Sequence, residues 1–311
     1  MPADTSSSAE KLLLLDSASL YFRGFYGVPA SVTAPDGTPV NAVRGFLDII
    51  AKLVTMYRPA SVAACWDDAW RPRWRVELIA SYKAHRVAQT LADGTSIEEV
   101  PEELTVQVPL IREALEVLGM PPVGAADHEA DDVIGTLAAH ATGPVDVVTG
   151  DRDLFQVVDD DRRVRVVYTA RGMSHLEVVT DDVVRAKYGV RAAQYVDFAV
   201  LRGDPSDGLP GVAGVGEKTA ANLLAAHGDL AGIRAAARDD RQLTPRVRAK
   251  ILEASDYLDV APAVVRVSDH ADVAVPAPAV PDAAAATALA RRWGLGGAMD
   301  RVLEALAAAA G

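Results

Sequence analysis

Five acidic side chains lie within 25 residues in the middle of the chain, in the segments HEADDVIG and VTGDRDLFQ: Glu129, Asp131, Asp132, Asp151 and Asp153. Hard cations such as Mg²⁺ or Mn²⁺ select carboxylate oxygens. Two such ions roughly 4 Å apart serve phosphodiester hydrolysis, because they neutralise the phosphate and activate a water. Any single Asp could be a helix cap or a turn residue. So many acids without a cation would repel one another, which favours a metal site.

Further acids stand where strands are expected to end. The apolar run Lys11 to Asp16 closes on an acid, and the strand-like SVAACW precedes Asp67 and Asp68. The β-branched run VDVVT precedes Asp151 in the same way. Residues that follow parallel strands meet in one crevice. The pattern therefore predicts an α/β fold with a mostly parallel central sheet flanked by helices, and with chemistry at its carboxyl edge.

Length and composition bound the class of protein. A chain of 311 residues exceeds the usual single core, so we expect two domains, residues 1–180 and 181–311. No apolar stretch reaches the roughly 18 residues that a membrane span needs, and the Ser-rich start does not resemble a signal peptide. These features predict a soluble cytoplasmic protein. Cys65 is the single cysteine and cannot close an intrachain disulfide.

Charge alone is a poor guide to the partner of this chain. The net charge of −12 argues against a polyanion, yet nine carboxylates gathered around cations would account for most of that excess. Residues 71–86 form the most basic window, with Trp70, Trp74 and Tyr82 interleaved. This window is either a solvated helix face or a surface that binds one nucleic-acid strand. The cluster from Tyr21 to Tyr26 around Arg23 leaves the same choice between base stacking and core packing.

The second half carries a glycine-rich hairpin signal. Asp204 and Asp207 lie in a Pro/Gly turn, and Gly211, Gly214 and Gly216 precede an expected helix from Lys218 to Ala226. Glycines let backbone amides approach a phosphate at a helix N-terminus. Residues 87–103 lack periodicity and predict a mobile segment. Prolines at 276, 278 and 281 mark a linker before an Ala-rich C-terminal helix, and no nucleotide-cofactor motif is present.

Taken together, LLLLDSASLYFRGFY, WDD, SYKAHR, HEADDVIGTLA, TGDRDLFQ and LRGDPSDGLPGVAGVGEKTAANLL closely resemble the 5′ nuclease family of flap endonucleases and bacterial 5′→3′ exonucleases, including the N-terminal nuclease domain of DNA polymerase I. The resemblance implies a PIN-like nuclease core with a helical arch around residues 74–118, followed by a helix-hairpin-helix domain. It implies a stand-alone form, because no polymerase segment follows. The implied metal ligands are Asp16, Asp67, Glu129, Asp131 and Asp132 for one group, and Asp151, Asp153, Asp204 and Asp207 for the second.

The same resemblance implies roles for other residues. Lys83 and Arg86 would steer and polarise the scissile phosphate, while Tyr82 would stack on a base. Val212 to Thr219 would be the helix-hairpin-helix that binds duplex backbone, with K⁺ held by backbone carbonyls at Val212 and Val215. The implied DNA contacts are Tyr21, Arg23, Tyr82, Gly211, Gly214, Gly216, Lys218 and Thr219. The chain departs from the common SDNIPG pattern at Gly208, and whether Asp67 or Asp68 is the ligand stays open.

The expected activity is a structure-specific 5′ nuclease of replication and repair that uses two or more Mg²⁺ or Mn²⁺ ions. Its expected partner is DNA with a single-stranded 5′ flap or a recessed or nicked duplex, with RNA-DNA primer junctions as a further substrate, and its expected state is a monomer associated with the nucleoid. One alternative is a module that binds branched DNA without cutting it. A phosphomonoesterase of the haloacid-dehalogenase type predicts a DxD after the first strand, which Asp16-Ser17-Ala18 lacks.

Overall fold

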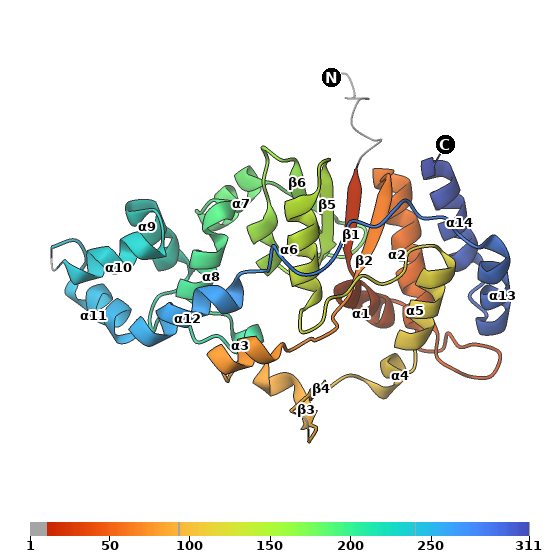
Figure 1. Ribbon diagram of the computed structural model, residues 1–311, viewed down its shortest axis with the longest axis horizontal. Helices are drawn as coiled ribbons and strands as arrows, with labels where there is room; N and C mark the ends of the chain where they lie inside the picture. The colour runs from red at the N-terminus through yellow and green to blue at the C-terminus, as the bar shows by residue number, and fades with distance from the viewer. Residues whose placement is uncertain (1–10, 93, 240, 311) are drawn as a thin grey trace.

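The computed structural model describes residues 11–92, 94–239 and 241–310, and a five-stranded sheet lies at its centre (Figure 1). The strands follow the order β2 (Ser61–Cys65), β1 (Leu12–Asp16), β5 (Val145–Thr149), β6 (Val164–Tyr168) and β7 (Glu177–Val179). The first four are parallel, and β7 runs antiparallel to β6. Asp16 pairs with Cys65, and Leu15 with Val148, so β1, β2 and β5 end level. The expected mostly parallel sheet is confirmed.

Helices cover both faces of this sheet, which explains why its strands are apolar without alternation. Leu12 and Leu14 of β1 face a core that includes α6 (Ala130–His140). Leu13 and Leu15 face the opposite core, which includes α1 (Ser17–Gly27) and α2 (Asn41–Tyr57). Successive side chains of a strand point to opposite faces, so one leucine run serves both cores.

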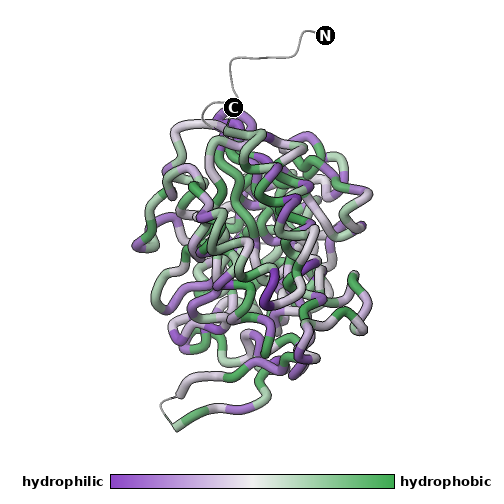
Figure 2. The backbone as a smooth tube through the Cα atoms, turned by 90° about the vertical axis from the view of Figure 1, so that its right-hand side faces the viewer, coloured by the Kyte–Doolittle hydropathy of each residue, from purple (hydrophilic) through white to green (hydrophobic). Residues whose placement is uncertain are grey.

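The expected arch segment, residues 74–118, is less helical than expected. Between β2 and α6 the chain forms α3 (Arg73–Leu78), a 3₁₀ turn η2 (Ala84–Arg86), an antiparallel hairpin of β3 (Val87–Thr90) and β4 (Ser96–Glu98), α4 (Glu102–Thr105) and α5 (Val108–Val117). Figures 1 and 2 show the hairpin extending beyond the body of the molecule. Its strands are mostly exposed. Because these strands have no buried face, their sequences show no apolar alternation that would predict a strand.

The second half is helical and lies to one side of the sheet (Figure 1). It begins with α7 (Asp181–Tyr188), the turn η4 (Ala192–Gln194) and α8 (Tyr195–Arg202), and continues through the turn η5 (Pro205–Asp207) to α9 (Glu217–His227). The remaining helices of this part are α10 (Leu230–Arg238), α11 (Pro245–Glu253) and α12 (Ser255–Val265). Leu201, Leu224 and Leu258 join the core that α6 covers, and η3 (Asp153–Val157) lies against α8.

The chain then returns to the first half. Residues 266–282 pass along α6, where the Ser268 amide donates to Asp132 and the Thr136 hydroxyl donates to the Ser268 carbonyl. Helices α13 (Ala283–Trp293) and α14 (Gly297–Ala310) then pack against α5 and α2. One Ala-rich C-terminal helix was expected, but the structure has two. Gly294 ends α13 in a left-handed conformation. Among the described helices, none has the length and apolar character to cross a membrane.

Candidate active site

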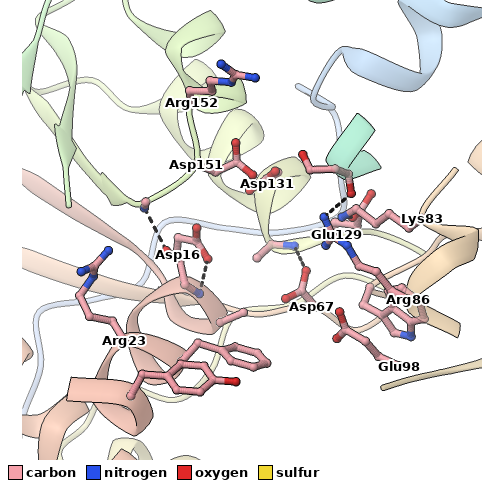
Figure 3. Close-up of a pocket in the computed structure, with 18 of the residues that line it drawn as sticks. Asp16, Arg23, Asp67, Lys83, Arg86, Glu98, Glu129, Asp131, Asp151 and Arg152 are labelled. Carbon is pink, nitrogen blue, oxygen red and sulfur yellow. Dashed lines mark hydrogen bonds and ion pairs between the residues drawn. The ribbon is translucent and has the colours of Figure 1, made fainter. Parts of the chain in front are cut away.

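A cleft of about 800 Å³ lies at the carboxyl edge of the sheet, between the strand ends and the arch segment (Figure 3). Six carboxylates line it: Asp16, Asp67, Glu98, Glu129, Asp131 and Asp151. Four cations also line it, namely Arg23, Lys83, Arg86 and Arg152. The cleft thus combines acids able to bind divalent cations with bases able to contact an anion.

Local structure fixes each acid by its backbone. Asp16 ends β1 and caps α1, where it accepts from the Ser19 amide at 3.1 Å and from the Thr149 hydroxyl at 2.6 Å. Asp67 follows β2 and accepts from the Ala130 amide at 2.9 Å, next to the N-terminus of α6. Asp68 is exposed and lines a separate hollow. Of the two neighbours, Asp67 is therefore the one in the cleft.

Burial and mutual repulsion raise the pKa values of several of these acids. Burial raises the pKa of Asp16 to about 7, and Asp67 and Asp151 add to the rise, while the Thr149 hydrogen bond opposes it. Burial, followed by Asp151 and Asp16, raises the pKa of Asp131 well above its usual range. The pKa of Asp67 is also raised, chiefly by burial. A cation bound among these groups would relieve the repulsion and release their protons.

The four acids of the second expected metal-ligand group do not all lie in one place. Asp153 and Asp207 line a small hollow of about 20 Å³ beside the cleft, together with Glu129 and Asp131. This volume suits one water or ion. The Oδ1 atom of Asp153 is buried there without a hydrogen-bond partner among the described residues. Burial, followed by repulsion from neighbouring acids, raises the pKa of Asp153. An unpaired buried oxygen of this kind fits a cation ligand.

Asp204 belongs to a different arrangement. It lies outside both hollows, and its carboxylate accepts from Ser206, from Arg202 at 3.1 Å and from Arg152 at 3.4 Å. Burial alone would raise the pKa of Asp204, but the Ser206 hydrogen bonds and the two arginines hold it below its usual range. As placed, Asp204 is engaged in ion pairs.

Asp132 corrects a second expectation. Its carboxylate is fully buried and accepts four hydrogen bonds, two of 2.7 Å from Arg75, one of 2.8 Å from the Ser268 amide and one of 3.1 Å from the Glu129 amide. A carboxylate offers about four acceptor positions, so none remains for a cation. Burial raises the pKa of Asp132, but Arg75 lowers it further, and the net shift is downward. The structure makes Asp132 a buried partner of Arg75 rather than a metal ligand.

Arg75 itself was expected in the basic surface window and is instead buried. Its guanidinium also donates to Glu129 at 2.5 Å and to the carbonyls of Val264 at 2.9 Å and Arg266 at 3.3 Å. It thereby joins α3, the N-terminus of α6 and the end of α12. No sequence signal marks this role, because the partners lie far away along the chain.

The arch segment places two basic side chains, Lys83 and Arg86, in the cleft, whereas its Tyr82 is buried. Lys83 forms an ion pair with Glu129, and Arg86 donates to Asp207 at 2.9 Å. Burial lowers the pKa of Lys83, but Glu129 outweighs it and keeps the ammonium charged. Tyr82 is only 4% exposed, and its hydroxyl donates to Glu129 at 2.7 Å. The expectation that Tyr82 stacks on a base is therefore wrong.

The aromatic cluster after β1 also divides. The Tyr21 ring lies against Phe22 and Trp66, with ring centroids 5.4 Å and 5.7 Å away, and burial raises its pKa. Tyr21 is therefore half-buried and packs against the core, so its ring is engaged by protein side chains rather than free for the expected DNA contact. Arg23 lines the cleft, and its Nε makes no hydrogen bond with any described residue. Phe22 and Tyr26 line the cleft beside it.

The glycine-rich hairpin lies between α8 and α9. Val212 and Val215 are buried, and the Val215 amide donates to the Val212 carbonyl at 2.9 Å. Gly214 and Gly216 are exposed, with open space where a Cβ would stand. Lys218 is exposed and Thr219 half-buried at the start of α9. Gly211 instead packs against the backbone of Arg202 and Gly203. The expected hairpin is thus present, with Gly211 in its support rather than at its surface.

Sequence reasoning missed several residues of the cleft. The Thr149 hydroxyl joins Asp16 to the Asp151 amide, and Arg152 and Glu98 add to the lining. A threonine at the end of a strand is too common to signal this role. Across the residues that the structure describes, no three His, Cys, Asp or Glu side chains already surround one cation position. Mg²⁺ fits such a set, because it keeps several waters and uses one or two carboxylates.

A parallel sheet with acids at its carboxyl edge, opposite a basic segment, defines an enzyme site for cation-assisted chemistry on an anion. Two family models match: the 5′-3′ exonuclease N-terminal resolvase-like domain over residues 11–189, and the 5′-3′ exonuclease C-terminal SAM fold over residues 190–286. The chain belongs to the 5′-3′ exonuclease family.

Relatives and a solved structure agree with this membership. A 5′-3′ exonuclease of Streptomyces coelicolor is 60% identical over 303 residues, covering 95% of this chain and 100% of that protein. A 5′-3′ exonuclease of Mycobacterium tuberculosis is 51% identical over 310 residues, covering 95% and 97%. The T5 D15 protein co-crystallised with metal ions has the same fold, with a TM-score of 0.62 and 17% identity over 97% of this chain and 100% of that one.

The acids predict a pH dependence of cation binding. Because the pKa of Asp16 rises from 3.8 to about 7 on folding, the metal-free protein loses stability as pH rises through this range. A bound cation removes that penalty. We expect Mg²⁺ or Mn²⁺ to raise the melting temperature more at about pH 8 than at about pH 6. Thermal unfolding with and without cation measures this, and an equal rise at both values would contradict it.

Proposed function

We propose that this chain is a metal-dependent 5′ nuclease that hydrolyses DNA phosphodiesters at 5′ flaps and 5′ ends, in primer and flap removal during replication and in repair. The observation that carries the proposal is the cleft that six carboxylates line together with Lys83 and Arg86. The relatives of Streptomyces coelicolor and Mycobacterium tuberculosis, both named 5′-3′ exonuclease, support it. So does the fold, which the chain shares with 5′ nucleases.

The residues of the cleft divide the work. One divalent cation would lie among Asp16, Asp67, Glu129, Asp131 and Asp151, bound directly by one or two of these carboxylates and through water by the others. A second cation would lie at Asp153 and Asp207. Asp204 can join this second group once the half-exposed Arg152, which also lines the cleft, turns toward a phosphate. When bound, the cations would neutralise the phosphate and activate a water.

The cationic side chains orient the substrate. Lys83 and Arg86 stand on the arch segment beside Glu129 and Asp207, so releasing these pairs would direct both charges at a phosphate. Arg23 faces the cleft from α1 with its Nε unpaired among the described residues. The arch segment would pass over a single-stranded 5′ end that enters the cleft.

The hairpin would bind duplex DNA away from the cleft. The exposed backbone at Gly214 and Gly216 precedes α9, with Lys218 in its first turn. Amides at such a position contact phosphates without reading sequence. A K⁺ ion held by the carbonyls at Val212 and Val215 belongs to the same proposal. We further propose Mg²⁺ or Mn²⁺ as the physiological cation, RNA-DNA primer junctions as additional substrates, a monomeric state and action at the nucleoid in the cytoplasm.

Cleavage of a labelled DNA duplex with a 5′ flap tests the proposal. We expect product with Mg²⁺ or Mn²⁺ and none after chelation, because the acids alone cannot neutralise a phosphate. Lys83→Ala should lower the single-turnover rate by about 10²-fold, as loss of a stabilising charge does in other active sites. Binding of the flap without cleavage under any divalent cation would favour a non-catalytic DNA-binding module instead. Turnover of a small phosphomonoester alone would favour a phosphatase.

A further inference from the structure

Gly208 lies where a side chain cannot fit. It follows η5 with φ 71°, in the left-handed region that favours glycine. A Cβ at this position would stand 2.1 Å from the carbonyl oxygen of Ser81 in the arch segment. The obstruction is backbone, which cannot turn aside as a flexible side chain can. Any other residue at 208 must therefore displace the segment around Ser81.

Besides the ion pair of Arg86 with Asp207, three hydrogen bonds to backbone carbonyls join the same two segments. The Ser81 hydroxyl donates to the Gly208 carbonyl at 2.8 Å, and the Lys83 amide donates to the Asp207 carbonyl at 2.9 Å. Arg86 donates to the Ser206 carbonyl at 2.7 Å. Lys83 itself has φ 48°, a conformation that a residue with a side chain adopts only when its surroundings require it. The contact with residues 206–208 supplies that requirement.

The opposite side of the segment is held as well. Arg71 donates to the Tyr82 carbonyl at 2.6 Å and to the Ala80 carbonyl at 3.0 Å. Residues 80–83 therefore lie between Arg71 and the turn at 206–208. A shift of the turn would act on the backbone of residues 80–83, to which Lys83 belongs.

The turn at residues 206–208 belongs to the segment 204–211, which leads into the glycine-rich hairpin and is called the hairpin support here. Asp204 and Leu209 exchange backbone hydrogen bonds of 2.9 Å and 2.8 Å, and Gly211 packs against Arg202 and Gly203. The chain from α8 through residues 204–211 to α9 thus touches the arch segment at one end and the hairpin at the other. No other described contact joins Lys83 to the second half so directly.

We propose that Gly208 is a positioning residue: its missing side chain lets the turn of the hairpin support hold the Lys83 backbone, which places the Lys83 ammonium in the cleft. This inference rests on the proposed function, because its consequence is a change in cleavage rate.

Gly208→Ala tests the proposal. We expect the single-turnover cleavage of a 5′-flap duplex to slow by about 10²-fold, because displacing a catalytic group by roughly 1 Å costs this much. Affinity for the duplex, measured without divalent cation, should change little, because the hairpin surface is untouched. The control is Gly189→Ala at the end of α7, which has the same φ of 71° but meets only an ordinary contact of 3.4 Å. This control should cleave at the wild-type rate.

A double-mutant cycle separates positioning from general damage. In a Lys83→Ala background, Gly208→Ala should cost far less than in the wild type, because the group it positions is gone. If Gly208→Ala does not fold, Ser81→Ala replaces it in the cycle, since it removes the hydroxyl bond to Gly208 without a clash. The inference is wrong if Gly208→Ala cleaves at the wild-type rate, or if it lowers the rate equally in both backgrounds. Either result leaves the proposed function intact. A wild-type protein that does not cleave overturns the proposed function and this inference with it.

Discussion

Asp151→Asn should reduce cleavage of a 5′-flap duplex by about 10³-fold, because cation-bound charge stabilisation is worth several kcal/mol. Asp151 lies at the end of β5 and faces the cleft, where its charge raises the pKa values of Asp16 and Asp131. The amide keeps the shape of the side chain and removes the charge that a cation needs. Affinity for DNA without divalent cation should stay equal or rise, because one negative charge is lost.

The matched control for this substitution is Asp68→Asn. Asp68 is an exposed acid next to Asp67 and lies outside the cleft. It should retain the wild-type rate within about twofold, as surface substitutions usually do. Single-turnover assays of both variants provide the comparison. If Asp151→Asn and Asp68→Asn cleave equally well, Asp151 has no part in the reaction.

Arg75→Met should lower the free energy of unfolding by about 3–5 kcal/mol, the usual cost of removing one partner from a buried ion pair. Arg75 is 2% exposed and pairs with Glu129 and Asp132, which are also buried. Methionine preserves part of the volume but leaves Asp132 without its cation and leaves Glu129 with Lys83 alone. Two backbone carbonyls, of Val264 and Arg266, lose their donor as well.

Denaturant unfolding of wild type and variant measures this loss. Arg301→Met is a suitable control, because Arg301 pairs with Asp48 at the surface, where both side chains are about half exposed. Its loss should stay within about 1 kcal/mol. A loss of similar size in both variants would show that Arg75 does not neutralise the buried acids.

The sheet and most of its acids could be predicted because both follow from local patterns. A buried parallel strand is a continuous apolar run, and an acid directly after it must emerge at the carboxyl edge. Asp16, Asp67 and Asp151 obey this rule, and all three line the cleft. The helix α2 (Asn41–Tyr57) also follows from a local pattern, because its buried apolar residues recur at helical spacing.

Residues with distant partners could not be placed in this way. Arg75 looked like a surface cation, because its carboxylate partners lie 54 and 57 positions along the chain. The aromatic rings of Tyr21 and Tyr82 suit a stacking platform or a core equally well by type, and only the fold decides between these roles. The packing of α14 against α2 likewise could not be predicted, because these two helices lie at opposite ends of the sequence.

The most direct test of the central claim is the anomalous scattering of Mn²⁺ in crystals of the wild-type protein. The claim is that the acids at the ends of β1, β2 and β5 and at the start of α6 bind divalent cations in one cleft. We expect anomalous peaks within about 2.2 Å of carboxylate oxygens of Asp16, Asp131 or Asp151, the distance usual for hard cations. Peaks confined to other parts of the molecule, or a cleft without any peak at saturating Mn²⁺, would contradict the claim.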